Sequence, residues 1–156
     1  MSRSKALFYG TVAVGTLDLL DAFTFFAFRD VAPVRILQSI ASGLLGRSAF
    51  EGGLLTASLG GVLHYCIAFF IVTVYFISSS RLPALIRSPL IFGPLYGLVV
   101  YSVMNFVVVP LSAAASGAPV GAVLTNGLLI HVLGVGLPSA LFARAAAASS
   151  RLPDVV

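Results

Sequence analysis

Four ionisable side chains lie within stretches that are otherwise almost entirely apolar. Asp18 and Asp21 are in the first long apolar stretch, and the two histidines of the chain, His64 and His131, are in later ones. A spacing of three residues puts the two aspartates on neighbouring positions of one helix face. Two carboxylates and two imidazoles can form the shell of a divalent metal ion or pass protons among themselves. These four residues are the candidate site.

Charged side chains are rarely kept inside a membrane without a reason. Each costs roughly 2.5 to 3.5 kcal/mol at the centre of a bilayer, even on a permissive insertion scale, unless it pairs, binds a ligand or lines water. The four residues together can be neutral in two ways, as ionised aspartates with protonated histidines or with all four uncharged. Exchange between these two states would be a proton relay. The alternative is a hydrogen-bonded core that fixes helix register and does nothing else.

Two further interpretations remain open, and the sequence specifies no cofactor. His64 and His131, on two different helices, could ligate a b-type haem, although Asp18 at the same depth is a poor neighbour for an apolar macrocycle. A non-catalytic assembly or accessory subunit could instead dock a partner subunit or a second copy through a GxxxG motif, Gly93 and Gly97. No G-x-S-x-G, H-E-x-x-H or Walker motif occurs, so no catalytic residue is assigned and we expect no enzyme.

Composition places the chain among membrane proteins. Of its 156 residues, 59% are hydrophobic and 9% are charged, and a soluble domain of this size has too little interior to bury so much apolar surface. The net charge is +4, but the basic residues occur mostly singly near the ends of apolar stretches. This pattern is typical of topology determinants and lipid headgroup contacts. The expected partner is the lipid bilayer and not a nucleic acid.

Four segments are long enough to cross the hydrocarbon core as helices, which takes about 20 apolar residues. They lie at residues 6–28, 54–78, 89–113 and 121–144. Because Asp18 and Asp21 interrupt the first segment and no cleavage site follows, we expect a retained span and not a signal peptide. No stretch is long and polar enough for a separate soluble domain. Residues 1–156 are therefore predicted to form a single all-α domain, a four-helix transmembrane bundle.

Residues 33–46, between the first and second spans, are predicted to form a short amphipathic helix at the outer interface. Pro33 suits its first turn and Gly46 its end, and the segment is too short to cross the membrane. Its predicted apolar face comprises Ile36, Leu37, Ile40 and Leu44, and its predicted polar face comprises Arg35, Gln38, Ser39 and Ser42.

Small residues recur along one face of each span and indicate where the helices pack. The packing glycines are predicted to be Gly60, Gly93, Gly97 and Gly127. In each span the polar residues share or adjoin this face, because polar groups must avoid lipid. The aspartates and histidines should therefore face one another at about one depth, with Asn105 on the outer side of the cluster.

The distribution of basic residues predicts that both termini are cytoplasmic, because cytoplasmic loops are enriched in Lys and Arg. The side with the termini carries Arg3, Lys5, Arg81, Arg87, Arg144 and Arg151, and the other side carries Arg29, Arg35 and Arg47. Six basic residues thus oppose three.

Two stretches, ILQSIASGLLGRSAF and MNFVVVPLSA, resemble a group of small, uncharacterised bacterial inner-membrane proteins with four predicted transmembrane helices. The resemblance implies a multi-pass protein of the bacterial inner membrane, and it attaches no activity or site residue to the chain. The candidate site leads us to expect a small transport or ion- or proton-handling protein.

Overall fold

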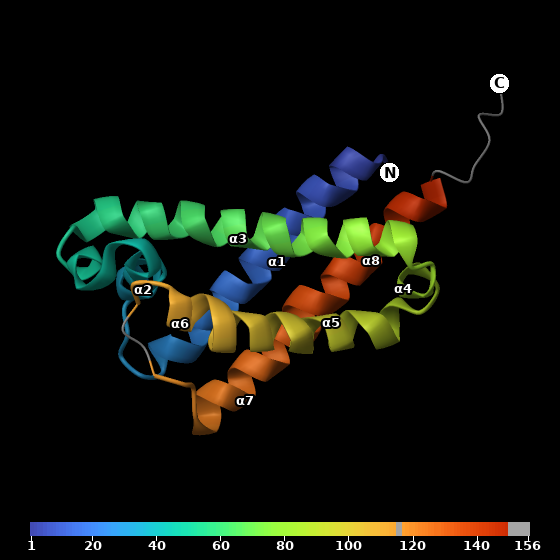
Figure 1. Ribbon diagram of the computed structural model, residues 1–156. Coiled ribbons are helices and arrows are strands. Elements are labelled where there is room, and N and C mark those ends of the chain that lie inside the picture. The colour runs from blue at the N-terminus through green and yellow to red at the C-terminus, as the bar shows by residue number, and fades with distance from the viewer. Residues whose placement is uncertain (115–116, 150–156) are drawn as a thin grey trace.

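Four long helices form a bundle in the computed structural model, which describes residues 1–114 and 117–149. They are α1 (Arg3–Ala27), α3 (Gly53–Arg81), a third span over Pro89–Leu111 and a fourth over Gly121–Ser149. Each is long and apolar enough to cross a membrane, which confirms the predicted all-α fold with four spans. In Figure 1 the N-terminus, the short helix α4 (Ala84–Arg87) and the end of the fourth span lie at one end of the bundle. We call this the terminal end.

The helix ends differ from the predicted span limits by a few residues. α3 continues to Arg81 and the fourth span to Ser149, because backbone hydrogen bonding does not stop where the apolar composition stops. The third span ends at Leu111, because Ser112 has an extended backbone with ψ of 174°.

The third and fourth spans each contain a π-helical turn before a proline. The third is α5 (Pro89–Val103), η2 (Met104–Val108) and α6 (Val109–Leu111), and the fourth is α7 (Gly121–Ile130), η3 (His131–Gly136) and α8 (Leu137–Ser149). The residue before Pro110 donates its N–H to the carbonyl five residues earlier, and so does the residue before Pro138. Proline lacks an N–H and its ring crowds the carbonyl four residues earlier, and the wider turn relieves that conflict.

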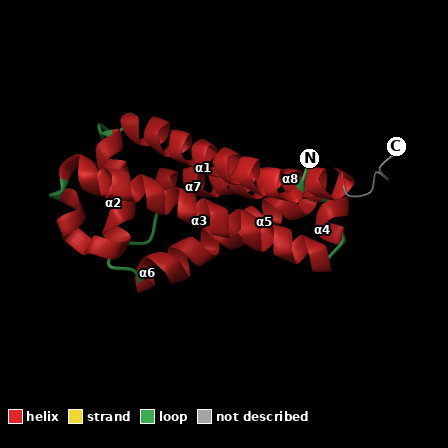
Figure 2. Cartoon of the chain, turned by 90° about the horizontal axis from the view of Figure 1, so that it is seen from above, coloured by secondary structure: helices red, strands yellow, loops and turns green. Residues whose placement is uncertain are grey.

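A short helix closes the opposite end of the bundle, which we call the α2 end. Figure 2 shows α2 (Pro33–Leu45) running across the long helices, and the 3-10 turn η1 (Gly46–Phe50) follows it. α2 begins with Pro33 in its first turn and ends at Gly46, whose φ of 59° lies in the left-handed region that glycine adopts readily. The predicted helix between the first two spans is confirmed.

The predicted division of α2 into an apolar and a polar face is wrong in part. Gln38 and Ser42, which we assigned to the polar face, are only 3% and 6% exposed. The amide Nε2 of Gln38 donates to the carbonyl of Gly53 at 3.1 Å and contacts Oγ1 of Thr56 at 3.5 Å. α2 therefore attaches to the start of α3 through a buried polar contact, which apolar periodicity cannot reveal.

Glycines allow the backbones of α5 and the fourth span to touch. A Cβ on Gly97 would lie 2.1 Å from the carbonyl O of His131, and a Cβ on Gly93 would lie 2.9 Å from Cα of Leu137. Gly136 makes the reciprocal contact, 2.1 Å from the carbonyl O of Gly93. The GxxxG face thus packs inside the chain, so a partner helix cannot use it as the accessory-subunit interpretation requires.

The substitution Gly60→Ala is expected to destabilise the protein by about 1 to 3 kcal/mol. A Cβ on Gly60 would lie 1.9 Å from the carbonyl O of Leu37, so α2 would have to move away from α3. The matched control is Gly61→Ala, whose Cβ would come only within 4.0 Å of Cδ2 of Leu37, and alanine favours helix. Denaturant unfolding in detergent micelles measures both variants. Equal stability of the two would contradict the described docking of α2.

Candidate functional site

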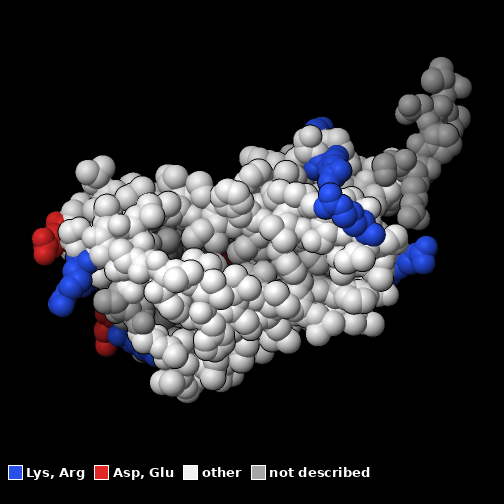
Figure 3. Space-filling model, viewed as in Figure 1, with Lys and Arg blue, Asp and Glu red and all other residues white. Residues whose placement is uncertain are grey.

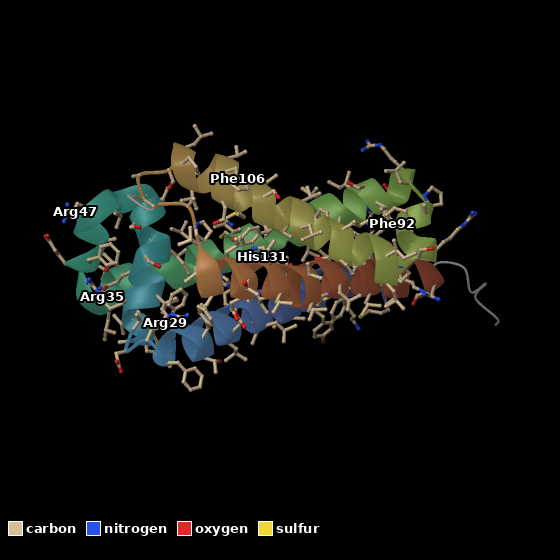
Figure 4. All side chains as sticks on the ribbon, turned by 90° about the horizontal axis from the view of Figure 1, so that it is seen from below. Arg29, Arg35, Arg47, Phe92, Phe106 and His131 are labelled. Carbon is tan, nitrogen blue, oxygen red and sulfur yellow. The ribbon has the colours of Figure 1, made fainter. Side chains whose placement is uncertain are left out.

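A cavity of about 1010 Å³ lies in the half of the bundle nearest α2. One polar residue from each span lines it, namely Asp18 of α1, His64 of α3, Asn105 of the third span and His131 of the fourth. The rest of the lining is mostly apolar, and it includes Val14, Ile71 and Val135 on the side toward the terminal end. In Figure 4 His131 lies midway along the bundle, with Arg35 and Arg47 at the α2 end. Both arginines are exposed and line the cavity, so the cavity reaches the surface there.

A hydrogen bond and an aromatic contact hold the imidazole of His131 in this cavity. Its Nδ1 donates to the carbonyl O of Gly127 at 2.9 Å, and its ring packs edge-on against Tyr101 with centroids 5.3 Å apart. A Cβ on Gly127 would lie 2.7 Å from the ring of Tyr101, so this glycine makes room for the aromatic contact. His131 is therefore held by its own helix and by the third span.

Asp18 approaches His131 without forming a hydrogen bond to it. The distance from Oδ1 of Asp18 to Nδ1 of His131 is 3.9 Å, and the two side chains are 27% and 17% exposed. This separation permits attraction if the imidazole is protonated, but it is too long for a hydrogen bond. Within the described part of the chain, no hydrogen bond to the Asp18 carboxylate is present, so it is free to accept one from a ligand.

His64 is attached to the backbone of α1. Its Nε2 donates to the carbonyl O of Gly15 at 2.7 Å. A Cβ on Gly15 would lie 2.7 Å from the ring of Tyr65, so glycine at this position lets α3 come close to α1. Because a carbonyl oxygen can only accept, the Nε2 atom carries the proton of a neutral ring, and Nδ1 remains an acceptor.

Asp21 lies outside the cavity lining and belongs to a different contact. Its Oδ2 accepts a hydrogen bond of 2.6 Å from Nδ2 of Asn126 in α7. Residues three apart differ by about 60° around a helix, so the two aspartates can face different neighbours. Of the four ionisable residues that we expected to face one another, Asp18, His64 and His131 therefore line one cavity, and Asp21 does not. The predicted site did not include Asn126. The sequence feature that could have indicated its role is a single amide side chain near the outer end of an apolar span.

Both π-helical turns bring a residue to the cavity. His131 is the first residue of η3, and Asn105 is the second residue of η2. Nδ2 of Asn105 donates to the carbonyl O of Tyr101 at 2.9 Å. π-helical turns within α-helices are frequent at functional sites, and here the two turns lie beside the same cavity.

The geometry favours neither a metal shell nor a haem. Among residues 1–114 and 117–149, no three His, Cys, Asp or Glu side chains are grouped closely enough to hold a metal ion. Bis-histidine ligation of a haem through Nε2 would require His64 to give up its bond to Gly15. The arrangement suits hydrogen bonding to a small molecule, or proton exchange with it, inside the cavity.

The helices and the cavity together define a class, a multi-pass membrane protein with a polar site inside its bundle. The chain matches no family model, and no curated protein or solved structure is detectably similar to it. The resemblance to four-span bacterial inner-membrane proteins is therefore supported as far as the four membrane-spanning helices.

The contact between Asp21 and Asn126 should contribute measurably to stability. A double-mutant cycle with Asp21→Ala and Asn126→Ala is expected to give a coupling energy of about 1 kcal/mol, because hydrogen bonds between transmembrane helices have about this strength. The cycle of Asp18→Ala with Asn126→Ala is the control and should show no coupling. Unfolding in mixed micelles measures both cycles, and stronger coupling of Asn126 to Asp18 would contradict the described pairing.

Proposed function

We propose that the protein is a small transport protein of the bacterial inner membrane, which binds a solute or a proton in the cavity between its spans. The supporting observation is that each of the four spans contributes one polar side chain to a single cavity. Its volume is near the upper end of the about 300 to 1,000 Å³ that is typical of small-molecule sites. Ligand sites in helix bundles are built in this way, from side chains on facing helices.

The division of the bundle into a hollow half and a packed half supports transport. Around the terminal end the core contains the buried residues Ala6, Tyr75, Phe76, Ala140 and Ala143. This packing separates the cavity from the terminal end, so the described state is one that is open at the α2 end. The π-helical turns η2 and η3 lie beside the cavity in the two helices that pack through glycines. A change at these turns would give access from the other side, as alternating access requires.

We propose that the α2 end and the mouth of the cavity face the periplasm, with both termini in the cytoplasm. In Figure 3 the basic side chains gather at the two ends of the visible face, and the acidic ones mainly at the α2 end. Described basic residues at the terminal end are Arg3, Lys5, Arg81, Arg87 and Arg144, and Arg151 lies outside the described residues. The positive-inside rule favours the cytoplasm for this end.

We propose solute binding without bond-breaking chemistry, because nothing in the cavity marks an activated nucleophile. Asp18 and His131 are the residues that we assign to binding, and His64 and Asn105 complete the polar belt of the cavity. Asp21 is assigned to the contact with Asn126 and not to binding.

Reporter fusions test the orientation. A reporter that is active only in the periplasm should be inactive when appended after Val156 and active when inserted after Gly117, in the loop between α6 and α7. The end of α6 and the start of α7, which flank this loop, lie toward the α2 end of the bundle in Figure 1. The opposite pattern would invert the proposed orientation.

Asp18→Asn should reduce transport by about tenfold or more, because the amide keeps the shape of the side chain but can neither take up a proton nor form a charge-assisted hydrogen bond with a solute. The measurement uses proteoliposomes with an internal pH-sensitive dye, an imposed pH gradient, and an external panel of amines, amino acids, sugars and carboxylates. The matched control is Asp21→Asn on the same helix, which should transport like the unmodified protein. Equal flux in both variants, or no protein-dependent flux with any solute, would contradict the proposal.

A further inference from the structure

In the polar belt of the cavity, the side chains of His64, His131 and Asn105 each donate one hydrogen bond to a backbone carbonyl. The three bonds are Nε2 of His64 to the carbonyl O of Gly15 at 2.7 Å, Nδ1 of His131 to that of Gly127 at 2.9 Å, and Nδ2 of Asn105 to that of Tyr101 at 2.9 Å. A carbonyl oxygen only accepts, so each of these nitrogens must be the donor. The partners therefore determine the tautomers of both rings and the orientation of the amide.

The atoms that these bonds leave over are mainly acceptors. In the neutral rings they are Nδ1 of His64 and Nε2 of His131, and the amide adds Oδ1 of Asn105 together with its second N–H. The carboxylate of Asp18 adds two more acceptor atoms, and its Oδ1 lies 3.9 Å from Nδ1 of His131, too far for a hydrogen bond. None of these acceptors has a hydrogen-bond partner among residues 1–114 and 117–149. A ligand that matches this belt must donate hydrogen bonds, and a positive charge would complement the carboxylate.

The rest of the cavity lining is mostly apolar, and it indicates which chemical group the rest of the ligand should carry. Toward the terminal end the lining consists of Val14, Ala68, Ile71 and Val135, and Met104 and Val108 flank the polar belt. An apolar body gains free energy from burial against such a surface, whereas a second charged group would lose hydration without a partner.

The cations at the mouth of the cavity, Arg35 and Arg47, lie at the α2 end, whereas the polar belt with Asp18 and the imidazoles lies deeper in the bundle. The guanidinium of Arg35 donates to Oε1 of Gln38 and to the carbonyl O of Phe50, both at 3.4 Å, and it lies 4.5 Å from the centroid of the Phe50 ring. Arg47 lies at the outer edge of the α2 end in Figure 4. Glu51 also lines the mouth, and it forms no ion pair with either arginine within the described chain.

We infer that the cavity binds a protonated primary amine on a small apolar body, with the ammonium group at Asp18 and the imidazoles. The inference rests on the proposed function, because it names the solute class for the same cavity. An ammonium group offers three N–H donors and one positive charge, which complements a carboxylate beside two or three neutral acceptors. A carboxylate ligand would meet Asp18 as a like charge.

Four probes of equal chain length separate charge from hydrogen bonding, namely n-hexylammonium, trimethylhexylammonium, hexan-1-ol and hexanoate. Binding is measured by calorimetry on the full chain in nanodiscs of zwitterionic lipid, with empty nanodiscs to subtract partitioning. Hexylammonium should bind about tenfold or more tightly than each other probe, because the others lack either the N–H donors or the charge. If trimethylhexylammonium binds as tightly as hexylammonium, the N–H donors do not contribute, and the hydrogen-bonding part of the inference is wrong. Equal or tighter binding of hexanol or hexanoate, or no binding of hexylammonium, would overturn the inference.

Variants and nitrogen chemical shifts locate the probe. Asp18→Asn should weaken hexylammonium binding about tenfold, and Asp21→Asn should leave it unchanged. In the unmodified protein with ¹⁵N-labelled histidine, hexylammonium should shift Nδ1 of His64 and Nε2 of His131, the two atoms without internal partners. This second measurement does not require any variant to fold. Binding without these shifts would place the amine elsewhere and overturn the assignment.

The two proposals can fail separately. If Asp18→Asn abolishes flux in proteoliposomes but hexylammonium binds no better than hexanoate, the transport proposal stands and the amine inference falls. If hexylammonium binds at Asp18 but no solute or proton crosses the liposome membrane, the cavity is an amine site without transport.

Discussion

The close contact between α5 and the fourth span is the constraint on which the candidate site depends. A Cβ on Gly97 would lie only 2.1 Å from the carbonyl O of His131. Any larger residue at position 97 would therefore push the fourth span outward. The imidazole that belongs to this carbonyl is the one that lies 3.9 Å from Asp18. Backbone contact with α5 therefore positions His131, and the packing of α1 against the fourth span, where a Cβ on Gly134 would lie 3.5 Å from Cβ of Leu17, brings Asp18 beside it. Lipid offers no hydrophobic drive for helices to associate, so packing of this kind must hold the bundle together.

The hollow and the packed halves of the bundle follow from where small and large side chains occur. Toward the terminal end, glycines and alanines let helices touch and residues such as Val72 and Tyr75 fill the centre. Toward the α2 end, α2 and η1 cap the bundle and the space between the spans remains open as the cavity. Polar residues lie where the interior is wide, because an unsatisfied polar group in a tightly packed apolar interior costs free energy that contact with a cavity avoids.

The sequence predicts the features that follow from contact with lipid, but it does not predict which polar side chains contact one another inside the bundle. Backbone groups in a membrane must be satisfied within the segment, so four long apolar stretches predict four helices, and avoidance of lipid predicts that Asp18 and His131 turn inward. No comparable rule predicts which group a buried polar side chain will form a hydrogen bond with. Nothing local to Asp21 indicates that it contacts Asn126, and amphipathic periodicity put Gln38 on the wrong face because its buried amide is satisfied by α3. The prolines are visible in the sequence, but a proline can also kink or end a helix, so it does not by itself predict a π-helical turn.

Arg29, at the α2 end of α1, has a consequence for how the protein responds to bilayer thickness. Its guanidinium lies 3.9 Å from the centroid of the Phe25 ring and donates to the carbonyl O of Phe25, which holds the charge at the headgroup level beside an aromatic anchor. Asp18 lies seven residues before Phe25, so it is about 10 Å deeper along the same helix than this charge. At the other end, residues 78–80 and 145–148 are serines and alanines, which tolerate water and headgroups alike. A thinner or thicker bilayer is therefore accommodated at that end, and the immersion depth of the cavity stays constant.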